Sequence, residues 1–420
     1  MNLFIKGVQI ADPGSPSNQQ ICDLRVENGL IAAIGQALKP AANDTVFEAE
    51  GMILSPGFFD LNCSVGDPGL ETREDLSTAT AAAAAGGFTG IAVLPVARPV
   101  VQSKGQVEYI LNKTRNNLVQ VCPLGAISHQ LEGKELAEMY DMKMAGAVAF
   151  TDADRPITDD GFMSRALQYV KSFGALLMLY PENTSLAGKS QIHESANSIL
   201  LGMKGIPALA EEMHIARDIF LAAYHDAPLH IQTLSTAGAV ALIRRAKKDG
   251  LKISCDVAAH QLVFTEEQLN DFDSHYKVKP PLRSKSDVKA LLAGLRDGTI
   301  DAVCTQHRPH EVEFKRVEFE HAAYGITGLQ TALPFLLKAG LDAAQIADKL
   351  AIQPRKILQL PVPVIQQGEK ANFTIYDPGA VWTLNRKSNF SKAENSPVFN
   401  QPLKGKVQLV YNHDQFKRYE

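Results

Sequence analysis

Hydrophobic positions in the middle of the chain fall into short runs that alternate with helical patterns. Eight apolar runs rich in β-branched residues have the length of buried strands, and they occupy residues 52–61, 89–95, 118–127, 146–151, 175–180, 228–234, 251–257 and 300–305. Helical patterns lie between them at residues 76–87, 133–146, 161–174, 208–225, 237–250 and 286–298, and several end at glycine, which commonly follows a helix C-terminus. Eight buried strands alternating with helices predict an α/β fold of the (β/α)8 TIM-barrel type.

Both ends of the chain show the two-residue alternation of exposed strands instead. The first segment contains an Asn28-Gly29 pair, a frequent hairpin turn, and the same character returns from about Gln366 onward. We therefore predict a small β-sandwich formed by the N- and C-terminal segments, residues 1–52 and 362–420, and a barrel over residues 53–361. A doubly wound open sheet is the competing fold, but no glycine-rich phosphate loop follows the first strand of the middle segment.

Composition narrows the class of protein. The 420 residues are 45% apolar and 21% charged, as in globular proteins, and 42 Lys and Arg against 46 Asp and Glu give a net charge of -4. This balance argues against a nucleic-acid binder and against a polybasic membrane anchor, and no apolar run is long enough to span a membrane. The N-terminal residues are typical of a strand and not of a signal peptide, so we expect a cytoplasmic protein.

The cysteines are few and odd in number, and no two form a CxxC pair; they are Cys22, Cys63, Cys122, Cys255 and Cys304. This pattern predicts buried free thiols and neither a disulfide framework nor a cysteine-rich zinc site.

Reactive residues of a barrel lie where its strands end. The first strand of the middle segment ends in Asp60-Leu61-Asn62-Cys63-Ser64, and alternation places Asn62 and Ser64 on one face. The other strand ends that carry polar groups are Thr151-Asp152-Ala153-Asp154, Leu179-Tyr180, Gln232-Thr233 and Thr305-Gln306.

Eight segments of the middle region, in this order and spacing, carry a resemblance to a known family. They are SPGFFDLN, AAAAAGGFTGIAVLPVARP, GAVAFTDADRPI, GIPALAEEMHIARD, HIQTLST, YKVKPPLRS, IDAVCTQHRPH and ITGLQTALPF, with ANFTIYDP at residues 371–378 in the tail. The chain resembles the dihydroorotase family of the amidohydrolase superfamily over most of its length.

The resemblance implies a two-zinc hydrolase site that this chain has largely lost. The family binds zinc through a His-x-His on the first strand, an Asp after the fourth, single His residues after the fifth and sixth, and an Asp after the eighth; the metal activates a water, and the last Asp moves the proton. The corresponding positions here are Asn62, Ser64, Tyr180, Thr233 and Gln306, and only the fourth keeps a carboxylate, at Asp152 or Asp154. We expect no metal site and no cofactor, although zinc is the family norm.

The positions that hold the substrate in the family have changed as well. Its carboxylate-binding Arg is replaced by Gly66, and two Asn positions are occupied by Val96 and Lys279. An Arg-to-Gly replacement removes the bidentate fork that recognises a carboxylate.

The other candidate groups have simpler interpretations. We expect His307 and His310 to anchor loops, His230 to be a hydrogen-bonded histidine on the outer face of its strand, and His260 to fall short of a rebuilt metal site. Cys63 and Cys304 flank the old site without an evident base that would make either a nucleophile. Asp60 and Asp152 are expected to be hydrogen-bonding scaffold groups.

The resemblance is strongest to the non-catalytic family members that accompany aspartate transcarbamoylase. It implies an inactive pyrimidine-pathway protein, a pseudoenzyme that serves as a structural partner of aspartate transcarbamoylase, alone or as a homo-oligomer, with no nucleic acid and no membrane as partner. One alternative is an active cyclic-amide hydrolase, converting dihydroorotate to carbamoyl aspartate with a rebuilt or single-metal site. A second is a non-enzymatic scaffold for another partner.

Overall fold

The parallel strands of the middle segment lie in two sheets in the computed structural model, which describes residues 2–419. One sheet contains β6 (Phe58–Cys63), β7 (Phe88–Val93) and β8 (Gln120–Pro123). The other contains β9 (Leu177–Leu179), β12 (Leu229–Ile231), β13 (Ile253–Ala258) and β14 (Ala302–Cys304).

Isolated bridges join the two sheets at both edges. Phe150 pairs in parallel with Gly125, just after β8, and with Leu177 of β9. Cys63 of β6 pairs in parallel with His307, just after β14. Eight strand positions, one at each predicted apolar run, therefore form a closed cycle of parallel pairings, which we call the strand ring. The predicted α/β fold is confirmed, although run 146–151 contributes only the bridges of Phe150.

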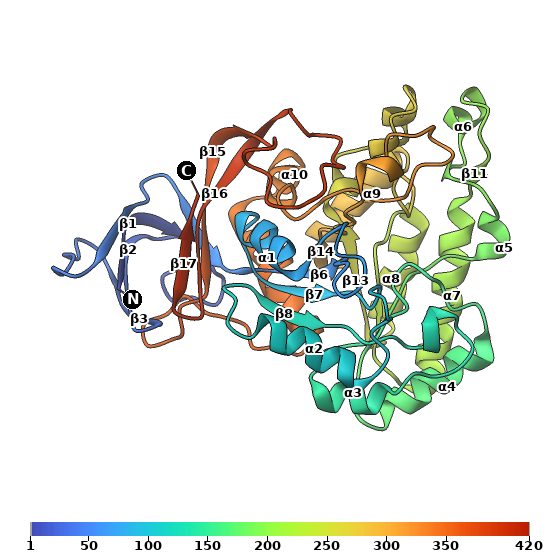
Figure 1. The fold of residues 1–420 in the computed structure, drawn as a ribbon, viewed down its shortest axis with the longest axis horizontal. Coiled ribbons are helices and arrows are strands. Elements are labelled where there is room, and N and C mark those ends of the chain that lie inside the picture. Colours follow the sequence, from blue (N-terminus) through green and yellow to red (C-terminus); the bar gives the residue numbers. More distant parts are fainter. Residues whose placement is uncertain (1, 420) are drawn as a thin grey trace.

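Helices follow the strands of the ring in turn and cover its outside (Figure 1). They are α1 (Leu76–Ala85), α2 (Lys104–Thr114), α3 (Met139–Ala145), α4 (Asp160–Lys171), α7 (Ala208–His225), α8 (Ala237–Lys248), α9 (Lys285–Arg296) and α10 (Ala332–Lys338). Shorter helices are α5 (Thr184–Ala187), α6 (Ala196–Leu200), α11 (Ala343–Ala347) and α12 (Gln353–Ile357), and β10 (Ile192–His193) pairs with β11 (Gly205–Ile206) between β9 and α7. The main hydrophobic core lies between these helices and the ring.

The local sequence sets both ends of α1. The Asp75 side chain caps the first turn by accepting a hydrogen bond from the backbone N–H of Thr78. In return, the Thr78 hydroxyl accepts a hydrogen bond from the backbone N–H of Asp75. The alanine run between them has high helix propensity, and Gly86 follows at the C-cap. A Cβ at Gly86 would overlap the carbonyl oxygen of Leu329, so the close packing of this helix end requires glycine.

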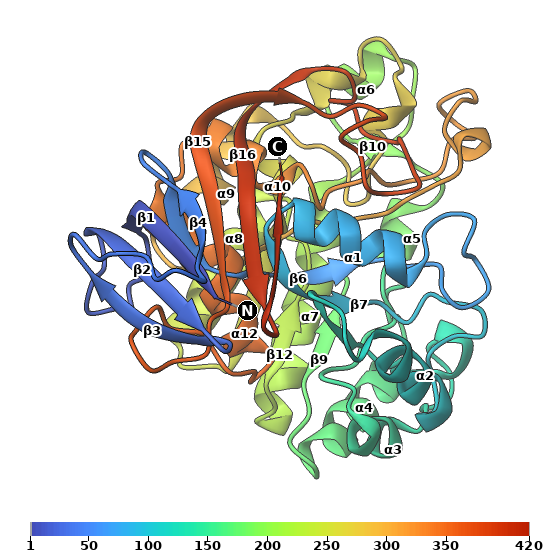
Figure 2. The same ribbon diagram turned by 60° about the vertical axis from the view of Figure 1, so that its left-hand side comes forward.

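Both ends of the chain meet in a second body, as predicted, but as one continuous sheet. Its strand order is β17-β16-β15-β5-β1-β2-β3, with β4 on β1. Figure 2 shows β1, β2, β3 and β4 on one side of it and β15 and β16 on the other. The strands are β1 (Leu3–Ile10), β2 (Ile21–Glu27), β3 (Leu30–Gly35), β4 (Thr45–Glu48), β5 (Ile53–Pro56), β15 (Phe373–Thr383), β16 (Pro402–Asn412) and β17 (Gln415–Arg418). The sheet is continuous because β5 pairs with β1 on one side and with β15 on the other. Residues from both termini, including Ile5 and Phe373, share one core.

The first apolar run of the middle segment divides between the two bodies. Residues Ile53–Pro56 pair in the terminal sheet, and Phe58–Cys63 pair in the strand ring. A Cβ at Gly57, between them, would overlap the side chains of Thr89 and Asn372. The terminal sheet therefore extends to Pro56, beyond the boundary at residue 52 expected from the sequence.

Two further features of the structure concern the cysteines and the length of the apolar helices. All five cysteines are free and buried, as predicted. Among residues 2–419, no helix combines the length and the apolar character needed to cross a bilayer.

Candidate functional site at the mouth of the strand ring

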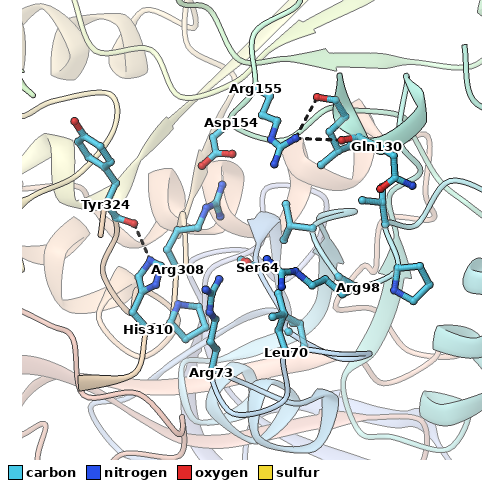
Figure 3. A pocket seen from close by; sticks show the side chains of 18 of the residues that line it. Ser64, Leu70, Arg73, Arg98, Gln130, Asp154, Arg155, Arg308, His310 and Tyr324 are labelled. Atoms are coloured by element: carbon cyan, nitrogen blue, oxygen red, sulfur yellow. Dashed lines mark hydrogen bonds between the residues drawn. The ribbon is translucent and has the colours of Figure 1, made fainter. Parts of the chain in front are cut away.

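The loops that follow β6, β7, Phe150 and β14 surround a cavity of about 680 Å³ (Figure 3). We call this region, beyond the carboxyl ends of the strands, the mouth. Five of the positions singled out from the sequence line the cavity, namely Ser64, Gly66, Val96, Asp154 and His310. The volume is in the range of small-molecule sites in proteins.

Asn62, at the first of the two positions where the family has histidine, is bound to a guanidinium group. Its Oδ1 accepts a hydrogen bond of 2.8 Å from Nη2 of Arg308, which lines the cavity. The backbone N–H of Ser64 donates to the carbonyl of His307 over 2.9 Å, so both positions contact the segment that follows β14. A fixed positive charge therefore lies where the family would place a cation.

Tyr180, Lys279 and Gln306 belong to one polar network beside the cavity. The Tyr180 hydroxyl lies 3.5 Å from Oε2 of the buried Glu182, whose Oε1 forms an ion pair of 2.8 Å with Nζ of Lys279. Gln306 donates from Nε2 to the Lys279 carbonyl over 2.8 Å. Burial and the nearby carboxylates raise the pKa of Tyr180 well above its usual value, so the phenol stays protonated and neutral.

The two carboxylates of the fourth strand end differ in position. Asp152 is buried, and its oxygens accept from the backbone of Ile127 and from the backbone and hydroxyl of Ser128. Burial raises its pKa. Asp154 is exposed and lines the cavity. Asp152 thus holds the loop after β8, and Asp154 is the carboxylate available to a bound molecule.

Asp60 is a scaffold group of the same kind as Asp152. It is fully buried and accepts from the backbone N–H and the hydroxyl of Thr305, each over 2.7 Å. These bonds join β6 to β14 across the closure of the ring, as expected for a hydrogen-bonding scaffold residue.

Three strand ends at the mouth keep an uncommon backbone. Ala153, Thr233 and Gln306 have φ values of 57°, 52° and 48°, in the left-handed region that β-branched and bulky side chains rarely adopt. Such geometry costs free energy and is typical of functional sites. The mouth therefore shares the strained backbone that is typical of functional sites.

Gly66 cannot regain an arginine on the present backbone. A Cβ at this position would overlap the carbonyl group of Leu70. Because this carbonyl is part of the backbone, it cannot move aside as the end of a flexible side chain could. The 66–74 turn is closed by hydrogen bonds from Leu70 to Gly66 and from Gly66 to Glu74. The loop itself, and not a single side chain, has adapted to glycine.

His230 faces the inside of the ring, which corrects the expectation of an exterior residue. Its register partner Met178 belongs to the cluster that fills the ring interior, whereas its neighbours Leu229 and Ile231 belong to the outer core. The ring nitrogens bond Ser254 at 2.9 Å and Asp256 at 3.0 Å. Because both faces of this strand are buried, alternation alone did not identify the inner face. The expected hydrogen bonding is present.

Asp256 is a residue that the sequence did not single out. Its Oδ1 accepts from the backbone N–H of Thr233 over 2.7 Å, while its Oδ2 contacts His230. The carboxylate thus fixes the left-handed turn at Thr233, whose hydroxyl has no hydrogen-bond partner.

Of the remaining histidines of the mouth, His260 and His307 are buried and His310 is half-buried. His307 accepts a hydrogen bond at Nδ1 from the backbone N–H of Gly328, and its Nε2 lies 3.5 Å from Glu74. His310 forms a hydrogen bond of 2.9 Å with the Tyr324 carbonyl. Both histidines therefore anchor loops. Burial lowers the pKa of His310 to about 4. Both ring nitrogens of His260 lack a hydrogen-bond partner, and burial with the charge of Arg308 lowers its pKa to about 3.

The two cysteines beside the mouth are poor nucleophiles. Burial raises the pKa of both Cys63 and Cys304 well above the usual value, and nearby carboxylates raise it further. The Cys304 thiol donates to Asp256 over 3.4 Å. Both groups therefore remain thiols at neutral pH.

The donor set at the family's metal positions does not fit a two-zinc centre. Amide, hydroxyl and protonated phenol groups are weak ligands for zinc, which prefers thiolate, imidazole and carboxylate. The amide at residue 62 is also engaged by the Arg308 guanidinium, and the oxygens of Asp152 are engaged by the loop after β8.

Sequence reasoning missed the arginines of the mouth. Arg73, Arg98, Arg155 and Arg308 all line the cavity, each on the loop after a different strand. The signal was available for three of them, because Arg98, Arg155 and Arg308 follow their strand ends within a few residues, whereas Arg73 lies farther from the end of β6.

Comparisons with known proteins agree with this architecture. A family model described as dihydro-orotase-like matches residues 51–238. The chain is 40% identical to a dihydroorotase of Geotalea daltonii over 410 residues, 96% of each chain, and 40% identical to a dihydroorotase of Acetivibrio thermocellus over 411 residues, again 96% of each.

Solved structures show the same fold at lower identity. L-hydantoinase (dihydropyrimidinase) from Arthrobacter aurescens superposes with a TM-score of 0.82 at 22% identity, over 97% of this chain and 94% of that one. Dihydropyrimidinase from Brevibacillus agri gives a TM-score of 0.80 at 22% identity, over 99% and 95%. The identity and coverage of the dihydroorotase relatives show that the chain belongs to the dihydroorotase family.

Proposed function

We propose that this chain is a catalytically inactive dihydroorotase-like protein of pyrimidine biosynthesis. It carries a (β/α)8 barrel without catalytic zinc, and it acts in the cytoplasm as a structural partner of aspartate transcarbamoylase. The observation that carries the proposal is the Asn62–Arg308 hydrogen bond, which places a guanidinium at the first position of the metal site.

The position that moves the proton in the family carries an amide in this chain. Opening a cyclic amide requires a deprotonated water and an acid for the leaving nitrogen. The Gln306 amide neither accepts nor releases a proton at neutral pH, and the Tyr180 phenol has a raised pKa. Asp154 remains as a carboxylate at the cavity, without a metal-binding partner set beside it.

The test of inactivity compares this chain with an active relative under one protocol. This protein and the Geotalea daltonii dihydroorotase are purified and dialysed in parallel, each in its own sample. Both are then analysed for zinc by mass spectrometry and assayed with dihydroorotate and with carbamoyl aspartate. We expect zinc and turnover in the relative, and neither above the blank in this chain. Stoichiometric zinc or measurable turnover in this chain would favour the alternative of an active hydrolase with a rebuilt or single-metal site.

An exposed apolar row on α7 supports a role in assembly. Leu209, Met213, Phe220 and Tyr224 are 50%, 49%, 75% and 83% exposed, and their spacing places them on one face of the helix. Large apolar side chains gathered on one surface are typical of protein–protein contacts.

The partner is tested by the mass of the complex. Mixing the chain with aspartate transcarbamoylase of the same organism at micromolar concentration and measuring the mass by light scattering should show a complex. We expect the Phe220→Ser/Tyr224→Ser variant to weaken it and Val381→Ser, a 70% exposed position on the terminal sheet, to leave it unchanged. A wild-type mixture that elutes as two separate proteins would favour a scaffold for another partner.

A further inference from the structure

Four arginines converge on the cavity at the mouth from different directions. Arg73 follows β6, Arg98 follows β7, Arg155 follows Phe150, and Arg308 follows β14. Figure 3 shows their side chains around a common space that also contains Asp154. The convergence comes from the ring, because the ends of parallel strands bring these loops to one edge.

Most of this positive charge has no acidic partner. Among residues 2–419, neither Arg98, Arg155 nor Arg308 forms an ion pair, whereas Arg73 lies 3.3 Å from Glu311. Of the two acidic residues that line the cavity, Glu132 pairs with Lys134 at 3.0 Å. Asp154 is thus the one lining carboxylate of the described chain that forms no ion pair, and the cavity is electropositive in a protein with a net charge of -4.

Hydrogen bonds to the protein hold two of the guanidinium groups in place. Arg308 donates to the His307 carbonyl over 3.2 Å as well as to Asn62. Arg155 donates to the Gln130 carbonyl over 3.1 Å. These acceptors are uncharged, so they orient the guanidinium groups without neutralising them. A set of fixed, uncompensated cations is prepared for an anion, because little side-chain freedom is lost when it binds.

The geometry points to a binding site for a small phosphorylated metabolite at the mouth of the ring. A carboxylate presents two oxygens in one plane and is satisfied by one guanidinium fork. A phosphate presents several oxygens in a tetrahedral arrangement and accepts forks from several sides, which is how the four arginines approach the cavity. Asp154 is placed to accept a hydroxyl hydrogen from the same molecule.

The arginines of this site are distinct from the metal and substrate positions of the family pattern, although Ser64, Gly66, Val96 and Asp154 of that pattern line the same cavity. The site uses Arg73, Arg98, Arg155 and Arg308, none of which occupies a position assigned from that pattern. Its occupant requires neither zinc nor turnover, so binding is measured on the isolated chain whether or not aspartate transcarbamoylase is a partner.

Calorimetric titration of the purified chain tests the site with three probes, namely pyrophosphate, ribose 5-phosphate and succinate. We expect both phosphate probes to bind more tightly than the dicarboxylate succinate, and the affinity to fall as salt is raised. Arg98→Ala removes an exposed side chain without a hydrogen bond or ion pair in the described chain, so folding is preserved and affinity should fall about tenfold.

Arg165→Ala is the matched control, because the Arg165 side chain is exposed on α4, forms no ion pair or hydrogen bond in the described chain, and does not line the cavity. Its affinity for pyrophosphate should equal that of the wild type. The inference is overturned by the absence of binding with both phosphate probes at millimolar concentration, by succinate binding as tightly as pyrophosphate, or by equal effects of Arg98→Ala and Arg165→Ala.

Discussion

Arg308 Nη2 donates a hydrogen bond of 2.8 Å to Oδ1 of Asn62, joining the loop after β14 to the end of β6. This contact occupies the position that the family resemblance assigns to a zinc-binding imidazole. The amide of Asn62 and the guanidinium of Arg308 are separate groups at one place, and each can be changed on its own.

Restoring the ligands without removing Arg308 should not restore zinc. We expect the variant Asn62→His, Ser64→His, Tyr180→His, Thr233→His and Gln306→Asp to retain little zinc after dialysis, since a fixed positive charge next to residue 62 opposes a divalent cation. Adding Arg308→Ala to the same variant should raise the zinc content. Equal zinc in the two variants, measured by mass spectrometry, would show that the guanidinium does not matter.

Returning an arginine to the substrate-binding position should destabilise the protein. Gly66→Arg forces a Cβ onto the Leu70 carbonyl, and we expect a loss of about 1–3 kcal/mol, measured as a lower melting temperature. Gly105→Arg is the matched control, because no heavy atom lies within 4 Å of a Cβ built at Gly105, which lies in the first turn of α2. Its melting temperature should be unchanged or higher. Equal melting temperatures for the two variants would mean that the backbone of the 66–74 turn rearranges to admit the side chain at little cost in stability.

The unpartnered hydroxyl of Thr233 should be dispensable. Thr233 and Thr374 are both fully buried, but only the Thr374 hydroxyl has an acceptor, the carbonyl of Gly87. Thr233→Val should leave the urea midpoint unchanged or raise it, whereas Thr374→Val should cost about 1 kcal/mol. A larger loss for Thr233→Val would indicate that its hydroxyl is hydrogen-bonded in solution.

His260 should make the protein less stable in mild acid. Burial and the charge of Arg308 lower its pKa to about 3, below the 6.5 of an ordinary histidine, so the unfolded chain takes up a proton that the folded chain does not. The stability associated with neutral His260 is complete above pH 6.5 and is lost progressively as pH falls toward 3. Within that window the loss is about 1.4 kcal/mol per pH unit.

Denaturation series at several pH values check this expectation. His260→Gln should flatten the decline of the unfolding free energy between pH 6 and pH 4, two values chosen inside the window above. His321→Gln changes an exposed histidine and should leave the slope as it is. An unchanged slope for His260→Gln would mean that its ring is accessible to water in the folded protein.

The pattern of apolar runs predicted the strands of the ring, but it did not predict where the ring begins or which strand faces point inward. Apolar runs identify all eight strand positions because each strand is buried on both faces. The same continuity conceals Gly57, where one run passes from the terminal sheet into the ring, since hydrophobicity does not distinguish two adjacent cores. It also conceals which face of β12 is inward, which is why His230 was placed outside.

The replaced positions of the site could be read from the sequence, but their new partners could not. Asn62 and Gln306 are evident departures from the family pattern, while their bonds to Arg308 and to the Lys279 backbone depend on how distant loops meet. The arginines after four strand ends are visible one at a time, and only the closure of the ring makes them neighbours.

The sheet shared by both termini sets an order of events during synthesis. β5 pairs with β15, so the edge of the N-terminal strands stays open until residues 373–383 have left the ribosome. The nascent chain must carry that open edge through translation of the whole middle segment, and an open strand edge invites pairing with other chains. Rapid completion of the tail therefore shortens the time for which the N-terminal strands expose this edge.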